Sequence, residues 1–197
     1  MSGRQPDAVE TQLQALLSKG DYRAALERMA HAHVDTVFRY CFRMLHADRL
    51  RATDVTQQVF EEVCKGITKY RGDASVKTWL LAVAHKQCLK EIDTRQRRGS
   101  MLQAHQDSIA AMAHAEATPS SESALLTQEG LAQLRGALER LNPEARSLLM
   151  LRFGIDMEHE LSIVEIANVL GLSRAAAYRK LQEALQCLRR IMHDGSA

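Results

Sequence analysis

Proline, glycine and aromatic residues are scarce in this sequence, and the residues that replace them favour helices. Three prolines and ten glycines stand among 197 residues, and Phe, Trp and Tyr together make up 5%. Ala, Leu, Gln, Arg and Glu are abundant instead. The composition therefore predicts an all-α protein, and its length is enough for one large or two small domains.

The sequence lacks the characteristic features of several functional classes. No apolar run approaches the roughly 20 residues that span a bilayer, and the start MSGRQPDAVETQ lacks the apolar stretch of a signal peptide. Cys41, Cys64, Cys88 and Cys187 form no CxxC or CxH pattern, which disfavours a disulfide scaffold and a zinc site. With no catalytic triad and no phosphate-binding glycine loop either, we expect a cytoplasmic protein that is not an enzyme, has no cofactor and does not insert into membranes.

Charge is distributed unevenly although the net charge is only +2. Residues 63–98 carry nine Lys or Arg against three acidic residues, and residues 174–190 carry five against one. Between them, residues 99–130 contain four acidic residues and no Lys or Arg. Two basic segments that flank an acidic spacer indicate a polyanionic partner.

Apolar spacing predicts helices in both halves of the chain. Asp21 is expected to cap a helix that starts near Tyr22, and Thr53 or Asp54 one that runs to about Tyr70. Another should end at Arg98. The apolar stripes are Val34, Val37, Phe38, Cys41, Phe42 and Leu45; Val55, Val59, Val63 and Ile67; and Val76, Leu80, Val83, Ala84 and Leu89.

Periodicity disappears over residues 99–123, where ATPSSES has the composition of a linker. We therefore expect two small helical modules: a domain of residues 31–98 after a helical extension of residues 1–30, and a second domain of residues 124–197. The acidic residues 99–123 would be a flexible connection between them.

The segment SIVEIANVLGLSRAAAYRKLQEAL has helix-turn-helix spacing. Ser162 and Glu165 can form a capping box, and Gly171 can supply a left-handed turn before the second helix. The first turns of that second helix would enter a major groove, and the less specific alternative is a helical hairpin with a basic face. The candidate DNA contacts are Ser173, Arg174, Tyr178, Arg179 and Lys180.

The first module decides between a repressor and another class of DNA-binding protein. ATDVTQQVFEEVCKGITKYRGDASVKTWLLAVAHKQCLKEIDTRQRR resembles the core segment of bacterial RNA polymerase sigma factors of the extracytoplasmic-function group. LNPEARSLLMLRF and LSIVEIANVLGLS resemble the module of that family that reads the promoter −35 element. The resemblance rests on Asp54, Gln57-Gln58, Phe60, Tyr70-Arg71-Gly72, Trp79-Leu80 and the basic residues 95–98.

The resemblance implies a promoter-specificity subunit whose partners are core RNA polymerase (its β′ clamp helices and β flap) and promoter DNA. The clamp helices would meet Asp54, Gln57, Gln58 and Glu61, which share one helix face. The opened −10 strand would meet Tyr70, Arg71, Lys77, Trp79, Lys86, Lys90, Arg95, Arg97 and Arg98. Trp79 is expected as either a stacking surface for a base or a core anchor. An anti-sigma factor as a further partner stays open.

Three residues depart from the family pattern. Gln58 replaces the usual Glu, Lys86 stands where relatives commonly carry Asn, and Lys90 where many carry Asp. Because the position of Lys86 is close to the base-reading site in this family, the −10 sequence preference cannot be transferred from relatives. Two other functions remain as alternatives: a stand-alone helix-turn-helix regulator that dimerises through its N-terminal helices, and a helical adaptor that binds protein only. His31 and His33 lie near Cys41 and His46, but a His-x-His pair does not converge on one helix face and no acid or thiol lies at supporting spacing, so no metal site is expected.

Overall fold

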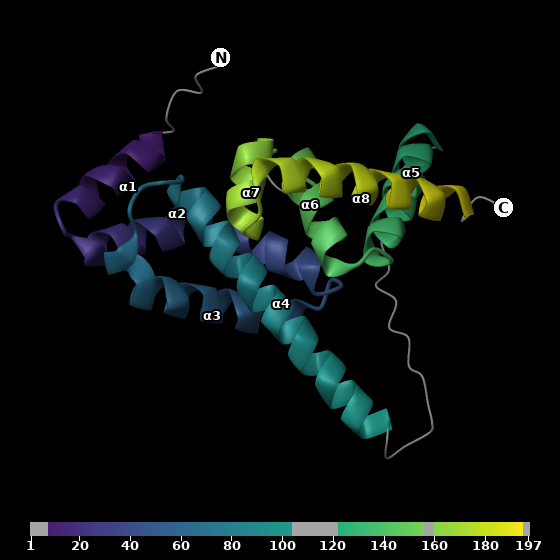
Figure 1. Ribbon diagram of the computed structural model, residues 1–197, viewed down its shortest axis with the longest axis horizontal. Helices are drawn as coiled ribbons and strands as arrows, with labels where there is room; N and C mark the ends of the chain where they lie inside the picture. The colour runs from purple at the N-terminus through teal and green to yellow at the C-terminus, as the bar shows by residue number, and fades with distance from the viewer. Residues whose placement is uncertain (1–7, 104–121, 156–159, 195–197) are drawn as a thin grey trace.

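The computed structural model describes residues 8–103, 122–155 and 160–194, and over these residues the chain is helical (Figure 1). The all-α prediction is confirmed, and no described helix is long and apolar enough to cross a membrane. The elements are α1 (Ala8–Ser18), α2 (Tyr22–Met44), α3 (Arg49–Gly66), η1 (Ile67–Lys69), α4 (Val76–Gln103), α5 (Glu122–Glu139), α6 (Pro143–Phe153), α7 (Ile163–Leu170) and α8 (Arg174–Asp194).

Helices α1 to α4 pack around one apolar core. The predicted stripes supply most of it, for example Val37, Val55 and Leu80, which are at most 1% exposed. Val34 and Leu89 are the exceptions, because both lie at the outer edge of their stripe and remain exposed. Leu13 of α1 is fully buried, so the N-terminal extension is part of this core.

The predicted start of α2 is confirmed, and the predicted start of α3 is wrong. Asp21 accepts a hydrogen bond from the Ala24 N–H at 3.1 Å. Helix α3 begins instead at Arg49, because Asp48, and neither Thr53 nor Asp54, is its cap. The chain can turn there because His46 and Ala47 adopt left-handed backbone angles with φ near 60°. Those angles end α2 and place Asp48 ahead of the next helix.

Helix α4 continues past the expected end at Arg98 to Gln103. Figure 1 shows its C-terminal half extending away from the other helices. Most of the expected linker, residues 104–121, lies outside the described residues.

The second module consists of α5 to α8, and its helix-turn-helix starts and turns where the sequence predicts. Asn142 caps α6 with Pro143 at the first helical position, and its side chain accepts from the Ala145 N–H at 2.8 Å. Gly171 has φ +65°, which is the left-handed geometry that the helix-turn-helix turn requires. The core between these helices includes Leu148, Leu149, Ile166 and Leu181.

The two modules pack on each other. Helix α7 lies along α4 (Figure 1), and α6 reaches α2. The fully buried Tyr40 hydroxyl lies 2.9 Å from His85 Nδ1 on α4 and 2.7 Å from Ser147 Oγ on α6. The Arg146 guanidinium donates to the Met44 carbonyl at the end of α2. Polar contacts therefore join the modules at a buried interface.

Candidate polymerase and nucleic-acid interfaces

One side of α3 presents the four polar residues that the sequence assigns to polymerase. Asp54, Gln57, Gln58 and Glu61 are all exposed, while Val55, Val59 and Val63 on the opposite side are buried. The Gln57 amide donates to the Glu61 carboxylate at 2.9 Å, which is a contact between residues one helical turn apart. The face is thus a continuous polar surface on a rigid helix.

A cavity of about 350 Å³ lies beside this face, between α3 and α4. Its lining residues are Gln58, Glu61, Glu62, Gln87, Lys90, Glu91 and Thr94. A hydrogen bond from Lys65, with a smaller effect of Lys90 and Lys86, lowers the pKa of Glu62. Lys90, which the sequence assigns to −10 DNA, therefore lies next to the expected docking face for polymerase.

The turn between η1 and α4 forms a second cavity, of about 230 Å³. Tyr70 and Trp79 form part of its wall, with ring centroids 5.1 Å apart and planes tilted by 43°. Its other lining residues are Lys69, Arg71, Gly72, Asp73, Ala74, Thr78, Ala82 and Asn168. Trp79 is half-buried, and it both packs on the core and lines this pocket; its role as a stacking surface for a base stays a prediction.

The turn is held by contacts that local sequence patterns do not reveal. The Tyr70 hydroxyl donates to the Ala74 carbonyl and accepts from the Gln14 amide of α1 at 3.0 Å. The Glu10 carboxylate accepts from the Val76 N–H, with its two oxygens at 3.0 and 3.1 Å. Glu10 and Gln14 were missed because their partners lie more than fifty residues away in the sequence.

Burial raises the pKa of Tyr70 above its ordinary value, so this side chain stays a neutral phenol at physiological pH. Its hydroxyl is occupied by the contacts with Ala74 in the turn and Gln14 of α1, which leaves the ring as the group available to a ligand. A neutral ring in the wall of a pocket is suited to stacking on a base.

The basic residues expected at −10 DNA line the outer side of α4. Lys86, Lys90 and Arg97 are exposed and follow one another at spacings of four and seven residues, so they share a face. Arg97 is also paired with Asp93 at 2.8 Å. Of the others, Arg71, Arg95 and Arg98 are exposed, and Lys77 is partly buried near the start of the helix.

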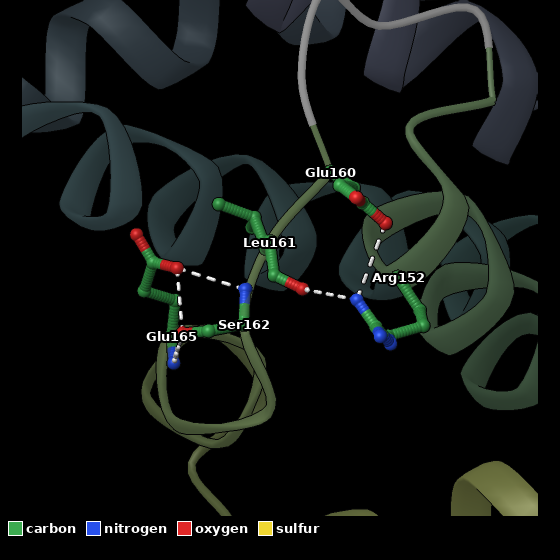
Figure 2. Close-up of polar contacts among 5 residues, drawn as sticks. All are labelled: Arg152, Glu160, Leu161, Ser162 and Glu165. Atoms are coloured by element: carbon green, nitrogen blue, oxygen red, sulfur yellow. Dashed lines mark hydrogen bonds and ion pairs between the residues drawn. The ribbon is translucent and has the colours of Figure 1, made fainter. Parts of the chain in front are cut away.

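The helix-turn-helix begins with the predicted capping box (Figure 2). The Ser162 hydroxyl accepts from the Glu165 N–H at 3.3 Å, and the Glu165 carboxylate accepts from the Ser162 N–H at 2.8 Å. Arg152 at the end of α6 contacts Glu160 and the Leu161 carbonyl, just before this cap. These contacts fix α7 to the preceding helix.

Helix α8 presents most of the residues predicted for −35 DNA. Arg174, Tyr178 and Arg179 are exposed, with Tyr178 at 59%. The Ser173 hydroxyl caps the helix by accepting from the Ala176 N–H at 3.2 Å. The Lys180 ammonium is paired with the Glu144 carboxylate of α6 at 2.7 Å, which is a contact between two helices of the module.

Asn168 of α7 lines the pocket at the turn, together with Tyr70 and Trp79 of the first module. No local sequence pattern predicts Asn168 at this pocket, because the contact depends on how the modules pack. The pocket wall is therefore shared between the modules in this arrangement.

The two modules match two known families. Residues 29–98 match Sigma-70 region 2, and residues 137–190 match Sigma-70, region 4. The chain is 27% identical over 171 residues to the RNA polymerase sigma factor YlaC of Bacillus subtilis, which covers 87% of this chain and 94% of that protein. It is also 27% identical to the ECF RNA polymerase sigma factor BldN of Streptomyces coelicolor, over 86% of this chain but only 61% of that protein.

The fold is also found among solved structures. In the co-crystal structure of the sigma factor RpoE with the anti-sigma factor NepR from Bartonella quintana, a chain superimposes with a TM-score of 0.63. The identity is 14%, and the match covers 85% of this chain and 96% of the other. With both sigma-70 regions present in order and similarity to YlaC over 87% of its length, this chain belongs to the RNA polymerase sigma factors of the extracytoplasmic-function type.

Proposed function

We propose that this sigma factor, which directs transcription initiation, uses three separate surfaces to bind polymerase and promoter DNA. The polar face of α3 docks on core polymerase, the pocket at the turn with the basic side of α4 holds the opened −10 strand, and α8 reads the −35 duplex. The pocket is the observation that carries this proposal, because it combines two aromatic rings with Lys69 and Arg71.

The −10 role follows from the chemistry of the pocket. A base that has left the duplex needs an aromatic surface to stack on and cations nearby for its phosphates. Tyr70 and Trp79 provide the first, and Lys69, Arg71 and the exposed lysines of α4 the second. Such a site binds single-stranded DNA and disfavours duplex DNA, whose bases are already stacked.

The −35 role rests on the exposure of α8. Its N-terminal residues Arg174, Tyr178 and Arg179 project from a capped helix that follows a tight turn, as in other helix-turn-helix proteins. An arginine can donate two hydrogen bonds to a guanine edge, whereas a phosphate contact carries no sequence information. We therefore assign base reading to Arg174 and phosphate contact to Arg179.

Polymerase docking is assigned to Asp54, Gln57, Gln58 and Glu61, which would meet the β′ clamp helices, and the second module would meet the β flap. The exposed carboxylates and amides are all hydrogen-bond acceptors. The chain would act in the cytoplasm, where polymerase works. The related RpoE is bound to an anti-sigma factor, and we propose a protein of that class as a further partner here.

The packed arrangement of the modules favours this proposal over a stand-alone regulator. Asn168 closes one wall of the pocket, so α7 has to move before a strand can lie along α4. We therefore expect the free chain to bind DNA weakly. A stand-alone regulator would bind its sites tightly without polymerase.

The test uses holoenzyme on a promoter that it transcribes, with variants that separate the two DNA surfaces. Trp79→Ala should abolish the permanganate reactivity of unpaired thymines near −10 and leave protection at −35 intact. Arg174→Ala should weaken protection at −35 first. The matched control is Arg189→Ala, near the far end of α8, which should alter neither pattern. If Trp79→Ala opens DNA as well as the wild type, the pocket does not hold the −10 strand.

A further inference from the structure

The turn that forms the pocket is tied to a helix outside the matched sigma regions. Region 2 begins at residue 29, whereas α1 spans Ala8–Ser18. From α1, Glu10 binds the Val76 N–H at the start of α4, and Gln14 binds the Tyr70 hydroxyl. Gln14 therefore contacts the start of the turn, and Glu10 contacts its end.

The Glu10 contact supplements the cap of α4. Ser75 already accepts from the Thr78 N–H at 3.1 Å, and the Val76 N–H would otherwise lack an acceptor at the first position of the helix. A carboxylate at a helix N-terminus also interacts favourably with the helix dipole. Both Glu10 oxygens lie within hydrogen-bonding distance of this one N–H. The start of α4, and with it Thr78 and Trp79, is thus positioned from α1.

The Gln14 contact acts on the aromatic wall. Its amide donates to the Tyr70 hydroxyl and also to the Glu10 carboxylate, both at 3.0 Å, so one side chain links the two contacts. Gln14 Oε1 also lies 3.7 Å from the position that a Cβ on Gly72 would take. Gly72 has φ +78°, so the chain in the turn passes close to Gln14.

Helix α1 is anchored firmly enough to position other residues. Leu13 is fully buried, and Val9, Leu16 and Leu17 pack on the same core. Glu10 and Gln14 lie four residues apart on one side of this anchored helix and are partly buried. Because α1 is packed on the core, we expect Glu10 and Gln14 to stay in contact with the turn rather than move away from it.

We propose that Glu10 and Gln14 are positioning residues for −10 recognition: they set the geometry of the Tyr70 and Trp79 pocket and thereby its choice among bases. The inference rests on the proposed function of the pocket. It extends the promoter-opening site to a helix that lies outside sigma-70 region 2.

The experiment selects single-stranded DNA from a pool randomised at ten consecutive positions, using reconstituted holoenzyme. Wild type should enrich one or two bases strongly. Glu10→Ala and Gln14→Leu should lose about tenfold in affinity for the selected oligonucleotide and flatten that base preference, while their affinity for core polymerase stays unchanged. Glu10→Gln, which keeps an acceptor for the Val76 N–H, should restore most of the preference.

The matched control is Glu27→Ala, which removes an acidic side chain that is 69% exposed and pairs with Arg23 on the same helix, α2. It should behave as wild type. A Glu10→Ala protein that binds core normally and keeps the full base preference overturns the proposal. A tighter binding of DNA by that variant also overturns it, because Glu10 would then be occupying a phosphate position. If wild-type holoenzyme shows no base preference, the proposed function of the pocket fails instead.

Discussion

The hydroxyl oxygens of Tyr40 and Ser147 lie 2.7 Å apart in a buried interface, although the two residues belong to different sigma regions. His85 Nδ1 lies on the other side of the same Tyr40 oxygen, at 2.9 Å. Removing one partner of a buried hydrogen bond destabilises the folded state, because the remaining polar group is shielded from water and has no other partner. The hydrogen bonds among Tyr40, His85 and Ser147 therefore hold α6 against α2 and α4.

Removing the Tyr40 hydroxyl should weaken the interface between the modules. Tyr40→Phe keeps the ring but leaves His85 and Ser147 without their shared partner, and we expect the free energy of unfolding to fall by about 1–2 kcal/mol. Urea unfolding curves measure this change. Tyr22→Phe is the control, because Tyr22 is 38% exposed and its loss of a hydroxyl should have no measurable effect. Equal midpoints for the two variants would contradict the role of Tyr40.

The stability of the chain should decrease as the pH falls from 6.5 toward 4. Burial lowers the pKa of His85 to about 4, so the unfolded chain takes up this proton before the folded chain does. The unfolded state is then favoured progressively, by about 3 kcal/mol in total across that window. Thermal unfolding at several pH values measures the slope.

His85→Leu provides the comparison for this pH dependence. It should reduce the slope between pH 6.5 and 4, whatever it does to stability at pH 8, because the titrating group is gone. A slope that survives in His85→Leu would assign the acid sensitivity to other groups, such as His46, whose pKa burial also lowers.

Arg146 should tolerate no substitution, not even by lysine. Its guanidinium donates to the carbonyls of Leu138, Glu139 and Leu141 and to that of Met44 in the other module. A lysine ammonium cannot reach acceptors in that fan-shaped arrangement. We expect Arg146→Lys to cost about 2–4 kcal/mol of unfolding free energy.

The control for Arg146 is Arg152→Lys on the same helix. The Arg152 side chain is 39% exposed and pairs with an exposed Glu160, so the substitution should cost less than about 0.5 kcal/mol. Similar losses in both variants, measured by urea unfolding, would mean that the contacts of Arg146 with the carbonyls are not what stabilises the interface.

Lys180 and Arg179 should differ in how they affect DNA binding, although they are neighbours. Arg179 is exposed, and Arg179→Ala should lower the slope of log K against log salt for −35 duplex by about one. Lys180 is paired with Glu144, so Lys180→Ala should lower the slope by less. Holoenzyme affinities at four salt concentrations decide this, and equal slopes for both variants would show that Lys180 leaves Glu144 to bind a phosphate.

Local patterns in the sequence predicted local structure well. The caps at Asp21 and Ser162 and the left-handed Gly171 each involve partners within a few residues, and all three are confirmed. The predicted start of α3 was wrong because Asp48 becomes a cap only after His46 and Ala47 turn the chain, and a positive φ is uncommon at alanine. The exposure of the α3 face and of α8 follows directly from helical spacing.

Contacts between segments that lie far apart in the sequence could not be predicted from the sequence alone. Glu10 and Gln14 look like ordinary polar residues of a short helix, and only the packing of α1 beside the turn gives them partners. In the same way, Asn168 reaches the pocket because α7 lies on α4, and Ser147 is a small polar residue without any local signal. The pairing of Lys180 with Glu144 also depends on the packing of α6 against α8.

The central claim, that this chain docks on core polymerase through α3, is tested most directly by the affinity of core enzyme for Asp54→Ala/Gln57→Ala. The charge-matched control is Asp35→Ala on the exposed side of α2. The account predicts that the double variant binds core RNA polymerase at least tenfold more weakly than wild type and fails in run-off transcription, while the control matches wild type. A double variant that binds core polymerase as tightly as wild type would contradict the account.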